Sequence, residues 1–302
     1  MVQNSVILGA ATGYTPEKVL IFLNSICKVN YTGTVTLLLN SDQFEEYQSF
    51  FSNMNYPFKL EFLKTSIGIF SSSKKIHKHL KKLIKYLSSY IVAKEPKLKK
   101  DFIDYLAFPH VSRFFEYHEY LKNNQFTHVM LTDTRDVIIQ ENPFSASVQG
   151  LFLGMEDHHT SIGHDSFHIK WISDVYGKQY LESIADQQIS CAGVTFGDYG
   201  SVMNYLEVMI HEFMSLPYYM MVRSNYDQGI HNKLLYCNAF KHPILCQPLE
   251  SPILTVGILD NNEIKMDNLG HILNKDGSIP MVVHQYDRHK NLERKLEEIY
   301  LN

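Results

Sequence analysis

The sequence lacks the features that mark several classes of protein. It has four cysteines in 302 residues, without a Cys-x-x-Cys pair or a zinc-like spacing. This predicts buried free thiols in a reducing compartment. No apolar run approaches the roughly 18 residues of a membrane span, so none is expected. The chain begins without a basic leader and apolar segment, which predicts no signal peptide. We therefore expect a cytoplasmic protein.

The chain also lacks any strong bias of charge. It carries 28 Lys and Arg against 32 Asp and Glu, a formal charge of −4, so no nucleic-acid partner is expected. Hydrophobic residues make up 45% and charged residues 20%, as in ordinary globular proteins. No repeat or low-complexity linker divides it. We expect a single domain over residues 1–302.

Short apolar runs predict the elements of an α/β fold. Residues 5–9 form a run that ends in glycine and predict a buried strand. Thr15 and Pro16 then suit the cap and first position of a helix. A β-branched run at 33–39 predicts a second, parallel strand. Further strands are expected at 128–132, 150–154, 191–197 and 280–283, and helices at 201–213 and 291–300.

Residues 74–100 have a different composition, with ten lysines and a single acid, Glu95. Apolar residues fall at helical spacing among the lysines, which predicts a basic amphipathic helix. They are Ile76, Leu80, Leu83, Ile84 and Leu87. One interpretation is a helix that faces the core and keeps its lysines in solvent. The other is a peripheral contact with an anionic membrane or a charged acceptor.

Two acids stand just beyond the predicted strand 128–132. Ligands of open α/β sheets bind at the carboxyl ends of strands, where Asp133 and Asp136 are expected. Two carboxylates there suit Mg²⁺ or Mn²⁺, which bridge protein oxygens to diphosphate oxygens and neutralise a leaving group. The alternative is an acidic turn in which Asp136 pairs with Arg135.

The stretch from Val129 to Phe144 (VMLTDTRDVIIQENPF) resembles the metal-binding region of GT-A-fold nucleotide-sugar glycosyltransferases. It is most similar to glycogenin-like and lipooligosaccharide galactosyltransferase-like enzymes, as an Asp-x-Arg-Asp variant of the DxD motif. Other segments match in the same order, and the resemblance spans about residues 5 to 290. These are Ala10-Ala-Thr-Gly-Tyr14, Arg113, Ser190-Cys-Ala-Gly-Val194, Asn225-Tyr-Asp-Gln-Gly229 and His284.

The resemblance implies a fold and a reaction. The fold would be a single GT-A-like (Rossmann-like) domain, with a mixed, mostly parallel central sheet flanked by helices. Its first half, about 1–136, would bind the nucleotide, and its second half, about 137–302, the sugar and acceptor. The enzyme would move a hexosyl group from a UDP-sugar to a saccharide or other hydroxyl acceptor with Mn²⁺ or Mg²⁺. The glycogenin-like class favours retention of configuration.

The resemblance also implies roles for individual residues. The metal ligands would be Asp133, Asp136 and His284. The donor would contact Ala10, Ala11, Thr12, Tyr14, Arg113, Asp133, Thr134, Arg135 and Arg288. The transferred sugar and acceptor would be handled by the candidate catalytic residues Asp227 and Gln228. Asp157 joins them as a candidate that contacts sugar hydroxyls, because it follows the carboxyl end of the strand predicted at 150–154.

The sequence departs from the family pattern in three places. Arg135 stands where the second acid of Asp-x-Asp is usual, so we favour Asp136 for direct metal ligation and Asp133 for ribose or metal. Cys191 replaces an asparagine. The usual His-x-x-Gly-x-x-Lys tail is replaced by His284-Gln-Tyr-Asp-Arg288. Arg288 takes the place of the lysine as a diphosphate clamp, a role that guanidinium suits.

Each candidate also has a purely structural interpretation. His284 would be a satisfied core histidine, Asp227 a helix N-cap, and Asp157 part of a solvated loop. Arg288 would form a surface ion pair, and Trp171 would pack in the core or on the surface. The histidines at 158, 159, 164 and 168 lack a completing cysteine or spaced carboxylate, so a polar loop is favoured over a metal site.

Three other functions compete with sugar transfer. A dinucleotide oxidoreductase is disfavoured because Gly9-Ala-Ala-Thr-Gly13 is only a partial glycine-rich turn. A metal-dependent phosphohydrolase with Asp133 as nucleophile usually has a second acid two residues on, where Arg135 stands. A non-catalytic protein that binds nucleotide sugars or glycans would keep the pocket and lack turnover.

Overall fold

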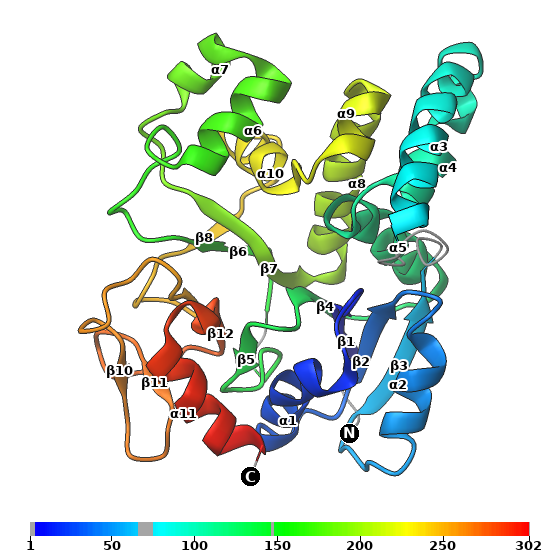
Figure 1. Cartoon of the computed structure of the whole chain (residues 1–302). Helices are drawn as coiled ribbons and strands as arrows, with labels where there is room; N and C mark the ends of the chain where they lie inside the picture. Colours follow the sequence, from blue (N-terminus) through cyan, green and yellow to red (C-terminus); the bar gives the residue numbers. More distant parts are fainter. Residues whose placement is uncertain (1–3, 66–74, 146–147, 302) are drawn as a thin grey trace.

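A seven-stranded sheet runs through the middle of the molecule in the order β3-β2-β1-β4-β7-β6-β8 (Figure 1). The computed structural model describes residues 4–65, 75–145 and 148–301. The strands of this sheet are β1 (Ser5–Ala10), β2 (Thr34–Leu39), β3 (Lys59–Lys64), β4 (His128–Asp133), β6 (Leu151–Met155), β7 (Ser190–Asp198) and β8 (Ile244–Cys246). The first four are parallel, and only β7 runs against its neighbours. The predicted α/β fold with a mixed, mostly parallel central sheet is confirmed.

Helices cover both faces of this sheet because its strands alternate their buried side chains. In β1, Val6 and Leu8 face one core and Ile7 the other. The first face packs against α4 (Lys99–Leu106), α5 (Pro109–Asn123), α8 (Tyr199–Ser215) and α10 (Asp227–Tyr236). The second face packs against α1 (Leu20–Lys28) and α2 (Phe44–Phe51). Three further helices, α6 (Ser166–Tyr176), α7 (Lys178–Ser183) and α9 (Tyr218–Arg223), lie above the carboxyl edge (Figure 1).

The chain opens with the predicted strand, helix and parallel strand. Pro16 begins a short 3-10 helix, Pro16–Val19, that leads into α1. Thr15 occupies the N-cap position, as predicted, but its side chain forms no capping hydrogen bond with a described residue. Pro16 follows at the first helical position, which its fixed φ suits.

A second, three-stranded sheet joins the end of the chain to its middle. Its order is β5 (Val137–Ile139), β12 (Val282–His284) and β9 (Ile253–Thr255). A third core lies between this sheet and the C-terminal helix α11 (Lys290–Leu301), which packs beside α1 (Figure 1). A two-stranded ribbon, β10 (Lys265–Met266) and β11 (Ile272–Leu273), lies nearby, and a 3-10 turn, Tyr286–Arg288, precedes α11.

The lysine-rich segment is helical but not one helix. It forms α3 (Lys75–Lys94), the 3-10 turn Pro96–Leu98 and the start of α4. The break follows from Pro96, which lacks an amide donor. Ile84 packs against the first core, but Leu83 and Leu87 are half exposed, so the core-facing interpretation is wrong for these two leucines. Residue 74 and the side chains of 75–81, which include the predicted apolar positions 76 and 80, lie outside the described residues. Among the described helices, none combines the length and apolar character needed to cross a bilayer.

Candidate functional site

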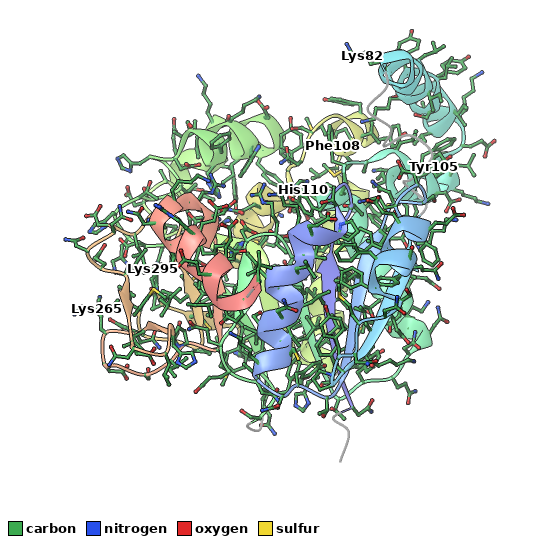
Figure 2. The ribbon with its side chains drawn as sticks, turned by 60° about the horizontal axis from the view of Figure 1, so that its bottom comes forward. Lys82, Tyr105, Phe108, His110, Lys265 and Lys295 are labelled. Carbon is green, nitrogen blue, oxygen red and sulfur yellow. The ribbon has the colours of Figure 1, made fainter. Side chains whose placement is uncertain are left out.

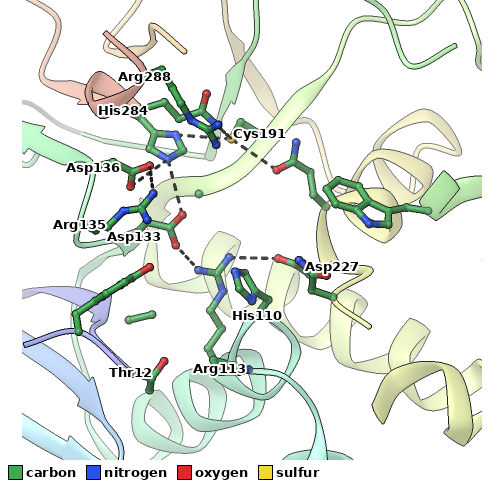
Figure 3. A pocket seen from close by; sticks show the side chains of 18 residues that line it. Thr12, His110, Arg113, Asp133, Arg135, Asp136, Cys191, Asp227, His284 and Arg288 are labelled. Carbon is green, nitrogen blue, oxygen red and sulfur yellow. Dashed lines mark hydrogen bonds and ion pairs between the residues drawn. The ribbon is translucent and has the colours of Figure 1, made fainter. Parts of the chain in front are cut away.

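A pocket lies at the point where the order of the central sheet reverses. β2 and β3 extend from one side of β1 and β4 from the other, and this switch opens a crevice at the carboxyl ends of the strands. Ala10, the last residue of β1, is in register with Asp133, the last residue of β4. The residues that follow both strands therefore meet in one place (Figure 3).

Most of the residues predicted from the sequence line this pocket. They are Ala10, Thr12, Tyr14, Arg113, Asp133, Arg135, Asp136, Asp227, Gln228, His284 and Arg288. Ala11, Thr134 and Asp157 are not among the described lining residues. Ala11 is buried and donates its amide to Leu38, and the Thr134 hydroxyl donates to the Ala10 carbonyl 2.9 Å away. Ala11 and Thr134 therefore bond to the strands β2 and β1 and do not line the pocket.

Asp133, Asp136 and His284 offer ligand atoms that all lie within 4.8 Å of one another. His284 Nε2 is 3.7 Å from Asp133 Oδ2 and 3.9 Å from Asp136 Oδ1. The second sheet causes this convergence, since β12 pairs antiparallel with β5 and sets His284 opposite Val137. The amide of Gln285 also donates to the Asp136 carbonyl at 2.8 Å. Among the described residues, no other such group is found.

A glycine leaves open the space beside two of these side chains, His284 and Asp133. A Cβ added to Gly193, on β7, would lie 2.3 Å from His284 Cε1, 2.6 Å from His284 Nε2 and 2.9 Å from Asp133 Oδ2. Real Cβ atoms keep longer distances from their neighbours than these. Any larger residue at position 193 would therefore displace the imidazole or fill the space between His284 and Asp133. The residues present therefore fit a small cation bound between Asp133 and His284.

The charges of the cluster also fit a cation. Burial raises the pKa of Asp136, and the neighbouring Asp133 carboxylate raises it further against the effect of His284. For Asp133, withdrawal from solvent would raise the pKa, but Arg113 and His284 outweigh it and lower it. Two adjacent carboxylates with an imidazole nitrogen are a donor set for a divalent ion.

Arg113 joins Asp133 to the opposite wall of the pocket. Its Nη1 lies 2.5 Å from Asp133 Oδ1 and its Nη2 3.3 Å from Asp227 Oδ2. The guanidinium is buried, and despite that burial the two carboxylates raise its pKa. α5 carries Arg113 toward the pocket, and Figure 3 shows it between the two acids. Arg113 therefore fixes the separation of Asp133 and Asp227.

Arg135 pairs with Asp136, as the acidic-turn interpretation has it, and it also pairs with a second acid, Asp287. Its Nη2 lies 2.9 Å from Asp287 Oδ2 and 3.8 Å from Asp136 Oδ2, so Asp287 is the closer partner. The guanidinium also lies over the Tyr14 ring, 5.8 Å from its centroid. Arg288 lines the pocket with a largely exposed side chain, 3.8 Å from Asp287 Oδ1.

Asp227 and Gln228 open helix α10 on the far wall. Tyr226 occupies the N-cap, and Asp227 pairs with Arg113, so the N-cap interpretation of Asp227 is wrong. Gln228 Nε2 donates to His168 Nε2 at 3.2 Å and to Glu156 Oε1 at 3.4 Å. These two partners hold the Gln228 amide at the pocket wall.

Glu156 is a residue that the sequence interpretation missed in favour of its neighbour Asp157. Glu156 lies behind the pocket wall, and its burial raises the pKa of the carboxyl group. Asp157 turns away: its Oδ1 accepts the His159 amide at 2.9 Å and lies 2.8 Å from His159 Nδ1. Both acids follow one strand, so nothing in the sequence separated their roles.

Cys191 connects the two walls behind the cluster. Its Sγ lies 3.6 Å from His284 Nδ1, donates to Gln228 Oε1 at 3.7 Å and accepts from Gln285 Nε2 at 3.7 Å. When the thiol donates to Gln228, the sulfur can accept a hydrogen bond from the Nδ1–H of His284. The Nε2 atom of His284 then faces the carboxylates of Asp133 and Asp136. Burial raises the pKa of the Cys191 thiol, which keeps it in the donor form.

Other lining residues carried weak signals or none. Trp171 lies in the pocket wall, whereas the sequence favoured packing in the core or on the surface. Pro109, His110 and Asn225 also line the pocket and had no assigned role. The local group of histidines separates: His168 faces Gln228, while His159 pairs with Asp157. The polar-loop interpretation of that group therefore fits better than a metal site.

No protein-family model matches the chain, and no curated protein matches its sequence significantly.

Proposed function

We propose that this chain is a glycosyltransferase that moves a hexosyl group from a UDP-sugar to a hydroxyl acceptor, with Mn²⁺ or Mg²⁺ as cofactor. The observation that carries the proposal is the cluster of Asp133, Asp136 and His284 at the switch point of the sheet. The resemblance of the ordered motifs to GT-A-fold glycosyltransferases adds the reaction class. A cytoplasmic location remains part of the proposal.

The donor would occupy the crevice beyond β1 and β4. Ala10, Thr12 and Tyr14 line the part next to β1, which would take the nucleoside. Asp133, Asp136 and His284 would hold the cation, which would neutralise charge on the departing diphosphate. Arg288 is the lining cation with the most exposed side chain and is the one we assign to the diphosphate.

The far wall would position the transferred sugar. Gln228 is held by His168 and Glu156 and presents its amide at the pocket. Asp227 is already bound to Arg113, so its carboxylate is poorly placed to take a proton from an acceptor. Among the described lining residues the remaining acids are Asp133 and Asp136, which serve the cation. An inverting mechanism needs a free base, so this arrangement favours retention.

The test is a panel of UDP-sugars assayed for slow hydrolysis with Mn²⁺, with Mg²⁺ and with EDTA. We expect metal-dependent release of UDP from at least one donor, and metal-dependent UDP binding by calorimetry. Absence of both would refute the proposal. UDP binding without turnover of any donor would support the non-catalytic binding protein. Metal-dependent hydrolysis of a simple phosphate ester, with no effect of UDP-sugars, would support the phosphohydrolase that uses Asp133.

A further inference from the structure

Helix α3 exposes a continuous stripe of large apolar and aromatic side chains. Leu83, Tyr86, Leu87, Tyr90 and Ile91 recur at the spacing of one helix face. Their exposed fractions are 54, 75, 50, 62 and 40%. We call these five residues the α3 stripe. Exposed apolar residues are ordinary when scattered, but a contiguous row marks an interaction surface.

The opposite face of α3 is already packed, so the stripe is not a face turned toward the core. Ser88 shares a hydrogen bond of 2.7 Å with the Tyr218 hydroxyl of α9. Val92 is buried in the first core, and Lys85 donates to the Val222 carbonyl. These contacts fix the rotation of the helix. Turning the stripe inward would break them, and the stripe therefore stays on the surface.

The charge of α3 identifies the kind of surface that the stripe would meet. The helix contains six lysines and no acidic residue. Among the described side chains, Lys82 flanks the stripe, Lys94 continues it at the C-terminal end, and both are exposed. Figure 2 shows Lys82 on helix α3, which lies at the margin of the molecule. Such a surface is complementary to an anionic partner.

The combination of side chains favours lipid over other anionic partners. A nucleic-acid surface uses lysines but has no need of a row of leucine and isoleucine. Tyrosine suits a bilayer interface, since its ring packs among acyl chains while its hydroxyl stays with the head groups. Lysines next to such a row lie level with acidic head groups. Leu83, Leu87 and Ile91 would supply the buried apolar area.

We propose that α3 is a peripheral membrane-docking helix that lays its stripe into an anionic lipid surface. The proposal stands independently of sugar transfer, because it rests on residues outside the pocket. One contact places the two features side by side. Lys85 lies over the Phe108 ring, 4.7 Å from its centroid, and the next residues, Pro109 and His110, line the pocket. Docking of α3 would hold the pocket wall beside the membrane.

The experiment is co-sedimentation of the full chain with vesicles, without any substrate. One set contains phosphatidylcholine alone and the other about one third phosphatidylserine. We expect binding to the acidic vesicles that weakens as salt rises. The double substitution Tyr86→Glu and Tyr90→Glu should weaken that binding at least about tenfold. The matched control is Leu269→Glu, at a 78% exposed leucine outside the helix, which should bind as the unaltered chain does.

A second variant, Lys82→Glu with Lys94→Glu, separates the contribution of charge and stays informative if the first variant misfolds. It should lose binding to acidic vesicles, with its thermal unfolding unchanged, because both lysines are exposed. The proposal is overturned if the unaltered chain binds neither set of vesicles or both equally. It is also overturned if either double variant binds like the unaltered chain, or if Leu269→Glu loses as much binding as the stripe variant.

Discussion

β4 and β6 run in the same direction in the central sheet, and acids stand at the carboxyl end of each. Asp133 and Asp136, the first acidic pair, line the pocket. Glu156 and Asp157, the second acidic pair, lie outside the described lining, one behind the wall and one capping a turn. Acidic residues at the same edge of one sheet thus lie in different environments, one pair in the pocket and the other outside its described lining.

The difference comes from what packs above each strand end. Above β4, the second sheet brings His284 to the first acidic pair, and Gly193 leaves the space between them open. Above β6, Gln228 covers Glu156 and the His159 turn engages Asp157. An acidic strand end therefore becomes a candidate cation site only where another element supplies a ligand and a gap.

The largest expected effect is that of Asp136→Asn. Loss of one carboxylate ligand should reduce metal-dependent UDP release at least about a hundredfold, because the cation supplies several kcal/mol of charge stabilisation. Without metal, the variant should unfold at the same temperature or higher at neutral pH. Burial and Asp133 raise the pKa of Asp136, so the folded chain disfavours its ionised form and gains from its removal.

Steady-state rates with saturating Mn²⁺ and thermal unfolding with EDTA measure the two effects of Asp136→Asn. The matched comparison is Asp157→Asn in the second acidic pair. If Asp136→Asn lowers activity and stability together, Asp136 is a structural turn residue and the cation site is wrong.

The next effect is that of Gly193→Ala. The added methyl group would lie 2.3 Å from His284 Cε1, so the imidazole must shift out of its place. We expect a 10- to 100-fold loss of Mn²⁺ affinity, about the range for disturbed ligand orientation. Calorimetric titration with Mn²⁺ measures it. The control is Gly200→Ala, where the nearest neighbour of a Cβ is Asp198 Oδ1 at 3.4 Å. Equal affinities for the two alanine variants would remove Gly193 from the site.

The sequence predicted the part of the fold whose pattern is local. Apolar runs and a proline at the helix start predicted β1, the first helix and β2. Further apolar runs predicted β4, β6 and β7. The sequence did not predict the short or weakly patterned strands. β3 is only partly buried, and charged residues are interspersed among its apolar ones. β5 has only three residues and is a strand because it pairs with β12. Pairing over such distances leaves no periodic signal.

In the candidate site, too, the sequence predicted some residues and could not resolve the roles of others. Asp133, Asp136 and His284 were named from the motif order, and the fold brings them together. Glu156 and Asp157 were not told apart, since the choice depends on Gln228 and His159, which are distant or loop residues. The place of Cys191 between His284 and Gln228 likewise depends on two strands, β7 and β12, and on helix α10.

A smaller effect is expected for Glu156→Gln in the second acidic pair. Burial raises the pKa of Glu156 above its unfolded value, so the unaltered chain loses stability as the pH rises through that shifted pKa. Glutamine does not ionise and can still accept from Gln228. The variant should become more stable than the unaltered chain, by about 1 kcal/mol, as the pH rises upward from about 4, near the ordinary glutamate pKa. Thermal unfolding across that range measures the gain.

The control for this pH dependence is Glu182→Gln, because Glu182 is an exposed glutamate. Its unfolding temperature should follow that of the unaltered chain at every pH. The opposite outcome is a Glu156→Gln variant that becomes less stable than the unaltered chain as the pH rises. It would show that His284 or Gln228 stabilises the ionised carboxylate by more than its burial destabilises it.

The smallest effect is expected for Asp157→Asn. The amide oxygen can still accept the His159 amide, and the lost charge pair involves a His159 side chain that is 67% exposed, where ion pairs contribute little. Activity should stay within about twofold and the unfolding temperature within about 1 °C. The position of Asp157 after a strand's carboxyl end placed it among the sugar-contacting candidates, whereas its contacts with His159 assign it to a turn. A loss of turnover comparable to that of Asp136→Asn, with unchanged unfolding, would mean that the loop reorganises when donor binds and that the two acidic pairs act together.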